Sequence, residues 1–302
     1  MPEKPFKSGF VAIVGRPNVG KSTLMNRLVG EKIAIMSEKA QTTRNRIQAI
    51  YTDEDAQIIF IDTPGIHKPK NELDDYMDQT AYTALEDVDM ILMMLNATEA
   101  IGPGDRFIMD KIAGLTMPKL LVVNKIDQLS SEDQAAYLKS IPKPDMFQQV
   151  LSLSALTGDG VDQLFQTLIE DLPEGPQYYP ADQISDHPEY FVVSEMIREQ
   201  VLQLTREEVP HSVAVTVDSM QRDEHDKVHI YANIIIERNS QKGIIIGKGG
   251  RVIKQIGVNA RKEIEKLLGT KIYLELFVKV EKNWRNNKAR LKEFGYSEKS
   301  NY

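Results

Sequence analysis

An eight-residue, glycine-rich segment near the N-terminus constrains the possible fold of this chain more than any other feature. The segment Gly15-Arg16-Pro17-Asn18-Val19-Gly20-Lys21-Ser22 matches the pattern G-x-x-x-x-G-K-[ST], with an apolar strand before it and a helical stretch after it. In that context the backbone N–H groups and the helix N-terminus form a nest for phosphate oxygens. The segment therefore predicts a nucleotide loop, in which Lys21 reaches the β- and γ-phosphates and Ser22 binds Mg²⁺.

A second polar element follows another apolar run, at residues 56–61. Its residues are Asp62-Thr63-Pro64-Gly65. A carboxylate at such a strand end can hold Mg²⁺ through water, and the Gly65 N–H can face the γ-phosphate. The same four residues also suit an ordinary turn. The phosphate loop upstream favours the metal-binding interpretation.

A third strand end carries groups that can recognise a base. The apolar run 119–123 leads into Asn124, Lys125 and Asp127. The Asp127 carboxylate can accept hydrogen bonds from the N1–H and 2-amino groups of guanine, a donor pair that adenine lacks. Asn124 can brace the loop. After the strand 150–153 come Ser154-Ala155-Leu156, and the Ala155 N–H is expected to be available to guanine O6.

These four motifs, in this order and spacing, resemble a translation-factor-type small GTPase domain over roughly the first 174 residues. The resemblance implies a mobile switch between the phosphate loop and Asp62, in the polar segment containing Gln41-Thr42-Thr43-Arg44. Thr43 is favoured as the residue that binds Mg²⁺ when the γ-phosphate is present, with Thr42 as the alternative. A plain surface loop with two threonines is the other interpretation.

The residue after Gly65 departs from the Ras pattern. Ile66 stands where Ras-like enzymes have the glutamine that orients the attacking water, and an alkyl group cannot do this. Either another group positions the water, or hydrolysis is slow and depends on a partner, so no catalytic base is assigned. In related GTPases with a Pro-Asn phosphate loop, the residue matching Asn18 can bind a monovalent cation. The resemblance thus implies a K⁺ site there; the alternative is that Asn18 caps the turn.

Composition limits the number of domains, the possible cysteine chemistry and the kind of partner. The 302 residues have room for two domains. No cysteine is present, so disulfides and cysteine-based zinc sites are excluded. No run of about 18 apolar residues occurs, and the protein is expected to be cytoplasmic. The net charge of −7 hides an asymmetry, since residues 1–180 carry a net −9 and residues 238–302 carry a net +10. The basic end predicts nucleic acid or an anionic membrane surface as its partner.

Alternating strands and helices in the first region predict an α/β fold with a mainly parallel sheet, in which only residues 48–52 form an antiparallel strand. Proline and glycine at 172–180 predict a linker. The second region is expected to run helix, strand, strand, helix, loop, helix, strand, an order that resembles a type II KH domain. The predicted boundaries are 1–174 for the GTPase domain, 175–187 for the linker, and 188–302 for the α+β KH domain with its basic tail.

A second glycine loop lies in this region. Gly247-Lys248-Gly249-Gly250 matches the G-x-x-G loop that clamps single-stranded nucleic acid, because glycines let the backbone approach a sugar-phosphate closely. Arg251 and Lys254 add charge at the start of the next helix. The run 244–246 could form a floor for unstacked bases. The alternative is a simple helix–helix turn with solvated lysines.

Trp284 lies in a basic segment and could stack on a base or pack on the domain edge. Packing is favoured. The terminal residues 292–302 are expected to fray.

A GTPase domain followed by a type II KH domain resembles the Era family over nearly the whole chain. The resemblance implies a monomeric, Mg²⁺-dependent GTP-hydrolysing switch. Its KH domain would bind the 3′ region of small-subunit ribosomal RNA during small-subunit assembly. Two rivals remain: a GTP-dependent binding module with incidental hydrolysis, and a regulator that is peripheral at the inner face of the cell membrane and holds anionic lipids with its basic end.

Overall fold

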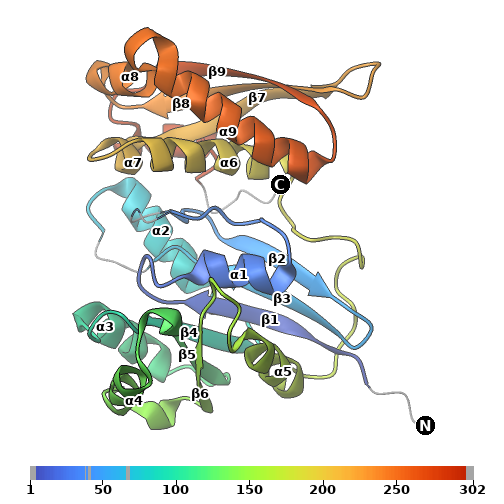
Figure 1. Ribbon diagram of the computed structural model, residues 1–302, viewed down its shortest axis with the longest axis vertical. Coiled ribbons are helices and arrows are strands. Elements are labelled where there is room, and N and C mark those ends of the chain that lie inside the picture. The colour runs from blue at the N-terminus through green and yellow to red at the C-terminus, as the bar shows by residue number, and fades with distance from the viewer. Residues whose placement is uncertain (1–4, 38, 40–41, 66–68, 297–302) are drawn as a thin grey trace. The chain divides into compact units, whose positions relative to one another are not determined.

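The computed structural model describes residues 5–37, 39, 42–65 and 69–296 (Figure 1). The chain divides into two compact units. The first contains Met1–Ala34, Thr43–Lys68 and Met77–Asp186, and the second contains Ile35–Thr42, Pro69–Tyr76 and His187–Tyr302. Each unit is described separately.

The first unit is built on a six-stranded sheet of order β2-β3-β1-β4-β5-β6. All neighbouring strands are parallel except β2 and β3, which are antiparallel. The strands are β1 (Lys7–Val14), β2 (Ile47–Thr52), β3 (Ala56–Asp62), β4 (Met90–Asn96), β5 (Lys119–Asn124) and β6 (Gln149–Leu153). Strands β3, β4 and β5 are buried at every residue, which explains their nearly continuous apolar sequence. The predicted fold class is confirmed.

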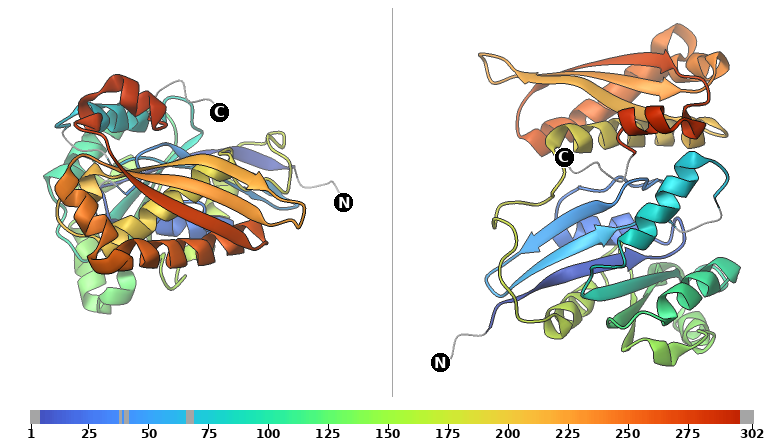
Figure 2. Two further views of the ribbon diagram at one scale, coloured as in Figure 1. Left: turned by 90° about the horizontal axis from the view of Figure 1, so that it is seen from above. Right: turned by 180° about the vertical axis from the view of Figure 1, so that it is seen from behind.

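Helices cover both faces of this sheet. Helix α1 and the first-unit part of α2 lie on opposite sides of the strands (Figures 1 and 2). The helices are α1 (Lys21–Val29), α2 (Glu72–Thr83), α3 (Pro103–Ala113), α4 (Ser131–Lys139) and α5 (Val161–Asp171). A core cluster joins Ala81 of α2 and Ile108 of α3 to Leu121 of β5. This doubly covered sheet brings the polar strand ends together at one edge, as expected for an open α/β sheet.

The residues predicted as a linker run along the edge of the first unit's sheet. The Ile50 N–H donates to the Ile184 carbonyl at 2.9 Å, and Ala49 bridges to Ser185. The buried side chain of Gln57 accepts from the N–H groups of Tyr178 and Tyr179 at 2.7 and 3.0 Å. The segment therefore covers the free edge of β2, which would otherwise expose unpaired backbone groups.

The second unit is built on a three-stranded sheet of order β7-β8-β9, with β7 and β8 antiparallel and β8 and β9 parallel. Its elements are α6 (Glu189–Leu204), α7 (Val209–Ser212), β7 (Ala214–Arg222), β8 (Val228–Ile236), α8 (Asn239–Ile246), α9 (Arg251–Leu268), β9 (Ile272–Val280) and α10 (Lys288–Glu293). Helices α6 and α9 pack under one face of the sheet, and the view from above shows the strands of the other face (Figure 2). This is the order predicted for a type II KH domain.

Helix α6 is buried more completely than its sequence indicates. Its helical periodicity predicts one apolar side, and the apolar residues Phe191, Met196, Ile197 and Val201 are indeed buried, whereas Leu204 at its end is 39% exposed. Residues 191–202 are all buried, charged ones included. Within the same unit, Arg198 is held by Glu195 at 2.7 Å and donates to the Thr42 carbonyl. Met36, whose N–H donates to Glu199 at 2.9 Å, and Thr42, both far away in sequence, thus contact the polar side of the helix.

Trp284 packs in the core of the second unit. Its Nε1 donates to the Ser212 carbonyl at 3.0 Å, and its ring stacks on Tyr296 with centroids 5.8 Å apart. The packing interpretation is confirmed. The expected fraying from residue 292 was wrong as far as Tyr296, which is buried, and residues 297–302 lie outside the described part.

Candidate functional site

The phosphate loop joins β1 to α1 and has three residues with positive φ. These are Gly15 (φ 156°), Asn18 (φ 65°) and Gly20 (φ 105°). A Cβ built on Gly20 would lie 2.2 Å from Nδ2 of Asn124, so position 20 needs glycine both for its conformation and for space. The loop is closely enclosed by the strands and loops around it.

Lys21 is 6% exposed, and its Nζ donates to the carbonyls of Gly15 and Arg16, both at 3.1 Å. Burial lowers the pKa of this ammonium group, and the nearby Asp62 carboxylate opposes the shift. The ammonium therefore lies inside the ring of the loop, where phosphate oxygens would replace carbonyl oxygens as its partners.

Arg16 holds the loop from outside. Its Nε donates to the buried carboxylate of Asp105 at 2.7 Å, and its NH2 group lies 2.9 Å from Glu99. The carboxylate of Asp105 also accepts from the Gly102 N–H at the start of α3. Sequence analysis assigned Arg16 only as part of the motif and missed this anchor, because its partners lie more than 80 residues away.

Three oxygen atoms converge beside the loop. The Ser22 hydroxyl donates to Oδ2 of Asp62 at 2.7 Å, and the Thr43 hydroxyl donates to the same atom at 3.1 Å. The two hydroxyls are 3.2 Å apart. Neighbouring ligands in an octahedral Mg²⁺ shell lie about 2.9 Å apart, so this set of hard oxygen donors fits Mg²⁺. Within the described ranges, no group of three or more His, Asp or Glu side chains offers another metal site.

The electrostatics of Asp62 also suit a cation. Burial raises the pKa of its carboxyl group, while the charge of Lys21 and the hydrogen bonds from Ser22 and Thr43 oppose that shift. A divalent ion would favour the ionised form. Of the two candidate threonines, Thr43 has its hydroxyl here, whereas the Thr42 hydroxyl donates to the Lys39 carbonyl at 2.7 Å.

The loop after β3 packs on the phosphate loop. A Cβ at Gly65 would lie 2.7 Å from Cγ of Pro17, so the missing side chain allows the close approach. The Thr63 hydroxyl donates to the Ile13 carbonyl at 3.0 Å, which anchors the turn that Pro64 continues. The predicted switch residues Gln41 and Ile66 lie outside the described residues.

The base-binding end is organised by Asn124, which is buried. Its Nδ2 donates to the Val19 carbonyl and its Oδ1 accepts from the Ala155 N–H, both at 2.8 Å. The Ala155 N–H was expected to be available to a guanine. Instead it is already engaged, because the Asn124 amide bridges the two loops, and a base would share this donor. Asp127 is exposed on a short 3₁₀ turn that follows Lys125 (φ 69°).

Residues 154–156 form the opposite side of this region. Ser154 is buried and accepts from the Thr157 N–H at 3.1 Å, while Leu156 is exposed. Arg27 of α1 donates to the carbonyls of Ala155, at 2.6 Å, and of Leu156. Sequence analysis missed Arg27, since no motif spacing relates it to these residues.

The second glycine loop, between α8 and α9, is open. Gly247, Gly249 and Gly250 all have positive φ, of 68°, 63° and 76°. A Cβ at Gly249 or Gly250 would meet nothing within 4 Å. Exposed Lys248, Arg251 and Lys254 surround the loop, and none of them forms an ion pair with a residue that the structure describes. The backbone and these cations are therefore accessible to a polyanion.

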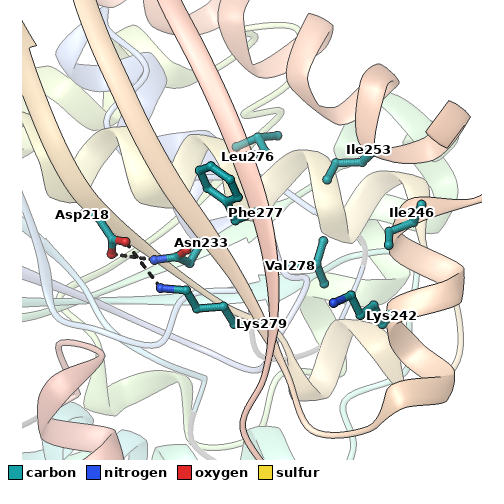
Figure 3. A pocket seen from close by; sticks show the side chains of 9 residues that line it. All are labelled: Asp218, Asn233, Lys242, Ile246, Ile253, Leu276, Phe277, Val278 and Lys279. Carbon is teal, nitrogen blue, oxygen red and sulfur yellow. Dashed lines mark hydrogen bonds and ion pairs between the residues drawn. The ribbon is translucent and has the colours of Figure 1, made fainter.

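A groove of about 670 Å³ lies beside this loop (Figure 3). It is lined by Asp218, Asn233, Lys242, Ile246, Ile253, Leu276, Phe277, Val278 and Lys279. Of the three isoleucines expected as a floor, only Ile246 lines the groove, because Ile245 is buried in the core and Ile244 points to solvent. Strand β9 supplies most of the remaining apolar surface.

The two sites define the class of this protein: a P-loop GTPase domain joined to a KH domain. A family described as 50S ribosome-binding GTPase matches residues 10–125, and the KH domain family matches residues 208–285. The GTPase Era of Lacticaseibacillus paracasei is 59% identical over 97% of this chain and 97% of its own length. The chain therefore belongs to the Era family of GTPases.

Two solved structures of relatives match this chain over 97% of its length. Era crystallised with MgGDPNP and nucleotides 1506–1542 of 16S ribosomal RNA has a TM-score of 0.93 and 42% identity, covering 97% of this chain and 99% of its own. A variant of Aquifex aeolicus Era bound to GDP and aluminium fluoride has the same TM-score and identity, covering 97% and 100%. The GTPase activity, its Mg²⁺ cofactor and the KH fold that the sequence predicted are thereby confirmed.

Proposed function

We propose that this protein is a GTP-hydrolysing switch that binds the 3′ region of small-subunit ribosomal RNA through its second unit and acts in small-subunit assembly. The observation that carries the proposal is the likeness, over 97% of the chain, to Era crystallised with MgGDPNP and 16S ribosomal RNA. We further propose that the monomer is the working form.

The geometry of the first unit supports a proposed nucleotide role for each of its motif residues. The backbone of 15–22 and the Lys21 ammonium bind the phosphates, and the Asp127 carboxylate selects guanine over adenine. The remaining base contacts come from Asn124, Lys125 and residues 154–156. Ser22, Thr43 and Asp62 are the residues that would hold Mg²⁺, which neutralises charge on the β- and γ-phosphate oxygens.

The switch follows from the position of Thr43. Its hydroxyl meets Asp62 at 3.1 Å, while the preceding residue in the chain, Thr42, already belongs to the second unit. With the γ-phosphate present, Mg²⁺ would hold the Thr43 hydroxyl beside the phosphate loop. Hydrolysis removes that interaction, and switch segments of this kind are then released. Neighbouring residues along the chain thus link the nucleotide to the RNA-binding unit.

Asn18 supports a proposed monovalent-cation site. The residue is exposed, with φ 65°, at the rim of the phosphate loop. A K⁺ ion held there would place positive charge where an arginine finger acts in other GTPases. The cation would assist hydrolysis in a chain whose residue 66 cannot orient water.

The RNA proposal places phosphates on the open glycine loop and bases in the adjoining groove. Lys248, Arg251 and Lys254 supply charge at the N-terminus of α9, and Gly249 and Gly250 leave room for the sugar-phosphate backbone. The alternative occupant of these cations is an anionic membrane surface. No helix of the described part is long and apolar enough to cross a bilayer.

A charge-reversed loop tests the proposal. We expect the double variant Lys248→Asp, Gly249→Asp to bind a labelled single-stranded RNA from the 3′ end of small-subunit ribosomal RNA at least about tenfold more weakly, with GTP affinity unchanged. Lys262→Asp is the matched control, because Lys262 is exposed on the same helix farther from the loop. Equal RNA affinities for the folded double variant would contradict the proposal. Competition between RNA and anionic vesicles separates RNA from lipid.

A further inference from the structure

One buried hydrogen-bond acceptor in the groove has no partner within the described part of the chain. Asn233 of β8 is 2% exposed, and its Oδ1 has no hydrogen-bond partner among the residues that the structure describes. Its Nδ2 donates to Oδ1 of Asp218 at 2.5 Å. Buried amide oxygens are normally paired, so this atom needs a donor from outside the chain.

The orientation of the Asn233 amide is set by a β-bulge. The pairing of β7 with β8 passes from Val217 opposite Ala232 to Ser219 opposite Tyr231, so Asp218 is an extra residue. Its carboxylate lies against Asn233, and Lys279 is 3.5 Å from its other oxygen (Figure 3). Because an ionised carboxylate only accepts hydrogen bonds, the amide nitrogen must face Asp218. The amide oxygen is then left for another donor.

This amide lies beside an exposed aromatic ring. Phe277 of β9 is directly opposite Asn233 in the register and is 46% exposed. Both residues line the same groove as Lys242 and Ile246 of α8, which lead to the glycine loop. Strand β9 is the edge of its sheet, so the groove continues around that edge. An RNA strand gripped at the loop therefore has a continuous path to Phe277.

Resting on the proposed RNA function, we infer that Asn233 is a specificity-determining residue. A base stacks on Phe277, and its exocyclic amino group donates to Oδ1 of Asn233. The Asp218 carboxylate, which accepts from Nδ2 of the same amide, also lines the groove and is a second acceptor there. Cytosine and adenine present an amino group on the Watson–Crick edge, and both are accepted. Uracil carries a carbonyl oxygen where cytosine carries its amino group, so its N3–H can meet one acceptor, but the flanking oxygen then faces the other acceptor and leaves it unpaired.

Cytidine and uridine hexaribonucleotides test this inference, because they have equal length and charge and the phosphate contribution cancels. The parent protein should bind the cytidine hexamer at least about tenfold more tightly. Asn233→Leu, which keeps the approximate side-chain volume, should reduce that ratio below about threefold. Thr216→Val is the matched control: Thr216 faces Asn233 across β7 and β8 but does not line the groove, so the ratio should persist.

Asp218→Ala provides a second variant at an exposed position, in case Asn233→Leu fails to fold. It removes the group that orients the amide, so the cytidine preference should fall in the same way. An unchanged ratio in the folded variants, or a parent protein without a preference, would overturn the inference alone. A parent protein that binds neither hexamer would contradict the proposed RNA function and the inference with it. The charge-reversed glycine loop, by contrast, should weaken both hexamers equally.

Discussion

The two glycine loops of this chain look alike in sequence and differ in their surroundings. Both precede a helix, both contain glycines with positive φ, and both carry a lysine. In the phosphate loop, Lys21 is buried and a Cβ on Gly20 would collide with Asn124. In the second loop, Lys248 is exposed and a Cβ on Gly249 would meet only open space.

This difference determines what each loop can bind. An enclosed ring of N–H groups with a desolvated ammonium is preorganised for one phosphate chain of fixed geometry. An open turn with solvated cations contacts any sugar-phosphate backbone and depends strongly on salt. Selectivity must then come from elsewhere: from Asp127 in the first site and, by our inference, from Asn233 in the second.

Replacing one glycine by alanine should have a large effect on ligand binding in the phosphate loop and a much smaller one in the second loop. Gly20→Ala displaces Asn124 and breaks its two bridging hydrogen bonds, at a cost of about 4 kcal/mol, so nucleotide affinity should fall at least about 1000-fold. Gly249→Ala should cost roughly 1 kcal/mol of unfolding free energy, from its left-handed φ. It should weaken RNA binding by far less than about 1000-fold, because the added methyl group meets open space in the free loop and approaches only one of several phosphate contacts. Fluorescent-nucleotide and RNA titrations measure both. Similar losses at the two sites would remove the contrast between enclosed and open loops.

Base selection in the first unit should depend on one carboxylate. Asp127→Asn should weaken GTP binding by about 100-fold, because two hydrogen bonds to a charged group at about 1.5 kcal/mol each are lost. The variant should gain affinity for xanthosine triphosphate, whose base keeps the N1–H donor and has a carbonyl oxygen in place of the 2-amino group, so it matches the acceptor and donor of an amide. Asp133→Asn, at an exposed carboxylate on α4, is the control. A variant that binds GTP as the parent does would show that β5 does not lead to the base.

Lowering the pH should weaken Mg²⁺ binding at the first site without changing RNA binding at the second. Because burial raises the pKa of Asp62, its protonated form, a poor metal ligand, is populated at a higher pH than for an ordinary aspartate. Mg²⁺ affinity should therefore fall by about tenfold for each pH unit below that raised pKa. RNA binding at the glycine loop does not involve Asp62, so it should not change. Magnesium titrations at pH 7.5 and 5.5 measure this.

Asp62→Asn is the control for the acid-pH prediction, because any remaining pH dependence then belongs to the nucleotide. Identical Mg²⁺ affinity of the parent at both pH values would argue against Asp62 as a ligand.

The smallest effect expected concerns the proposed cation. GTP hydrolysis should be at least about threefold faster in K⁺ than in Na⁺, since only the ion near Asn18 differs. Asn18→Gly removes the side chain while suiting its φ of 65°, and should abolish the difference. Single-turnover hydrolysis in the two salts, for parent and variant, provides the measurement. A salt effect that persists in Asn18→Gly would place the cation elsewhere.

Local patterns were sufficient to predict both folds and most of the candidate site. The signals used were all short-range: the strand–loop–helix context around Lys21, the polar ends of β3 and β5, and the glycine loop at 247–250. Each depends on hydrophobic periodicity or on a turn that only certain residues can adopt. For this reason the predicted sheet, KH order and GTPase class were confirmed.

What the sequence could not predict was set by pairs of residues far apart along the chain. The Arg16–Asp105 ion pair, the Arg27 brace and the Asn124–Ala155 bridge involve partners that no spacing rule connects. The tertiary structure also decided that Met36 and Thr42 contact the charged side of α6, and that no residue in the described part of the chain pairs with Oδ1 of Asn233. Sequence determines what each segment can form locally, whereas burial and pairing depend on which segments meet in the folded chain.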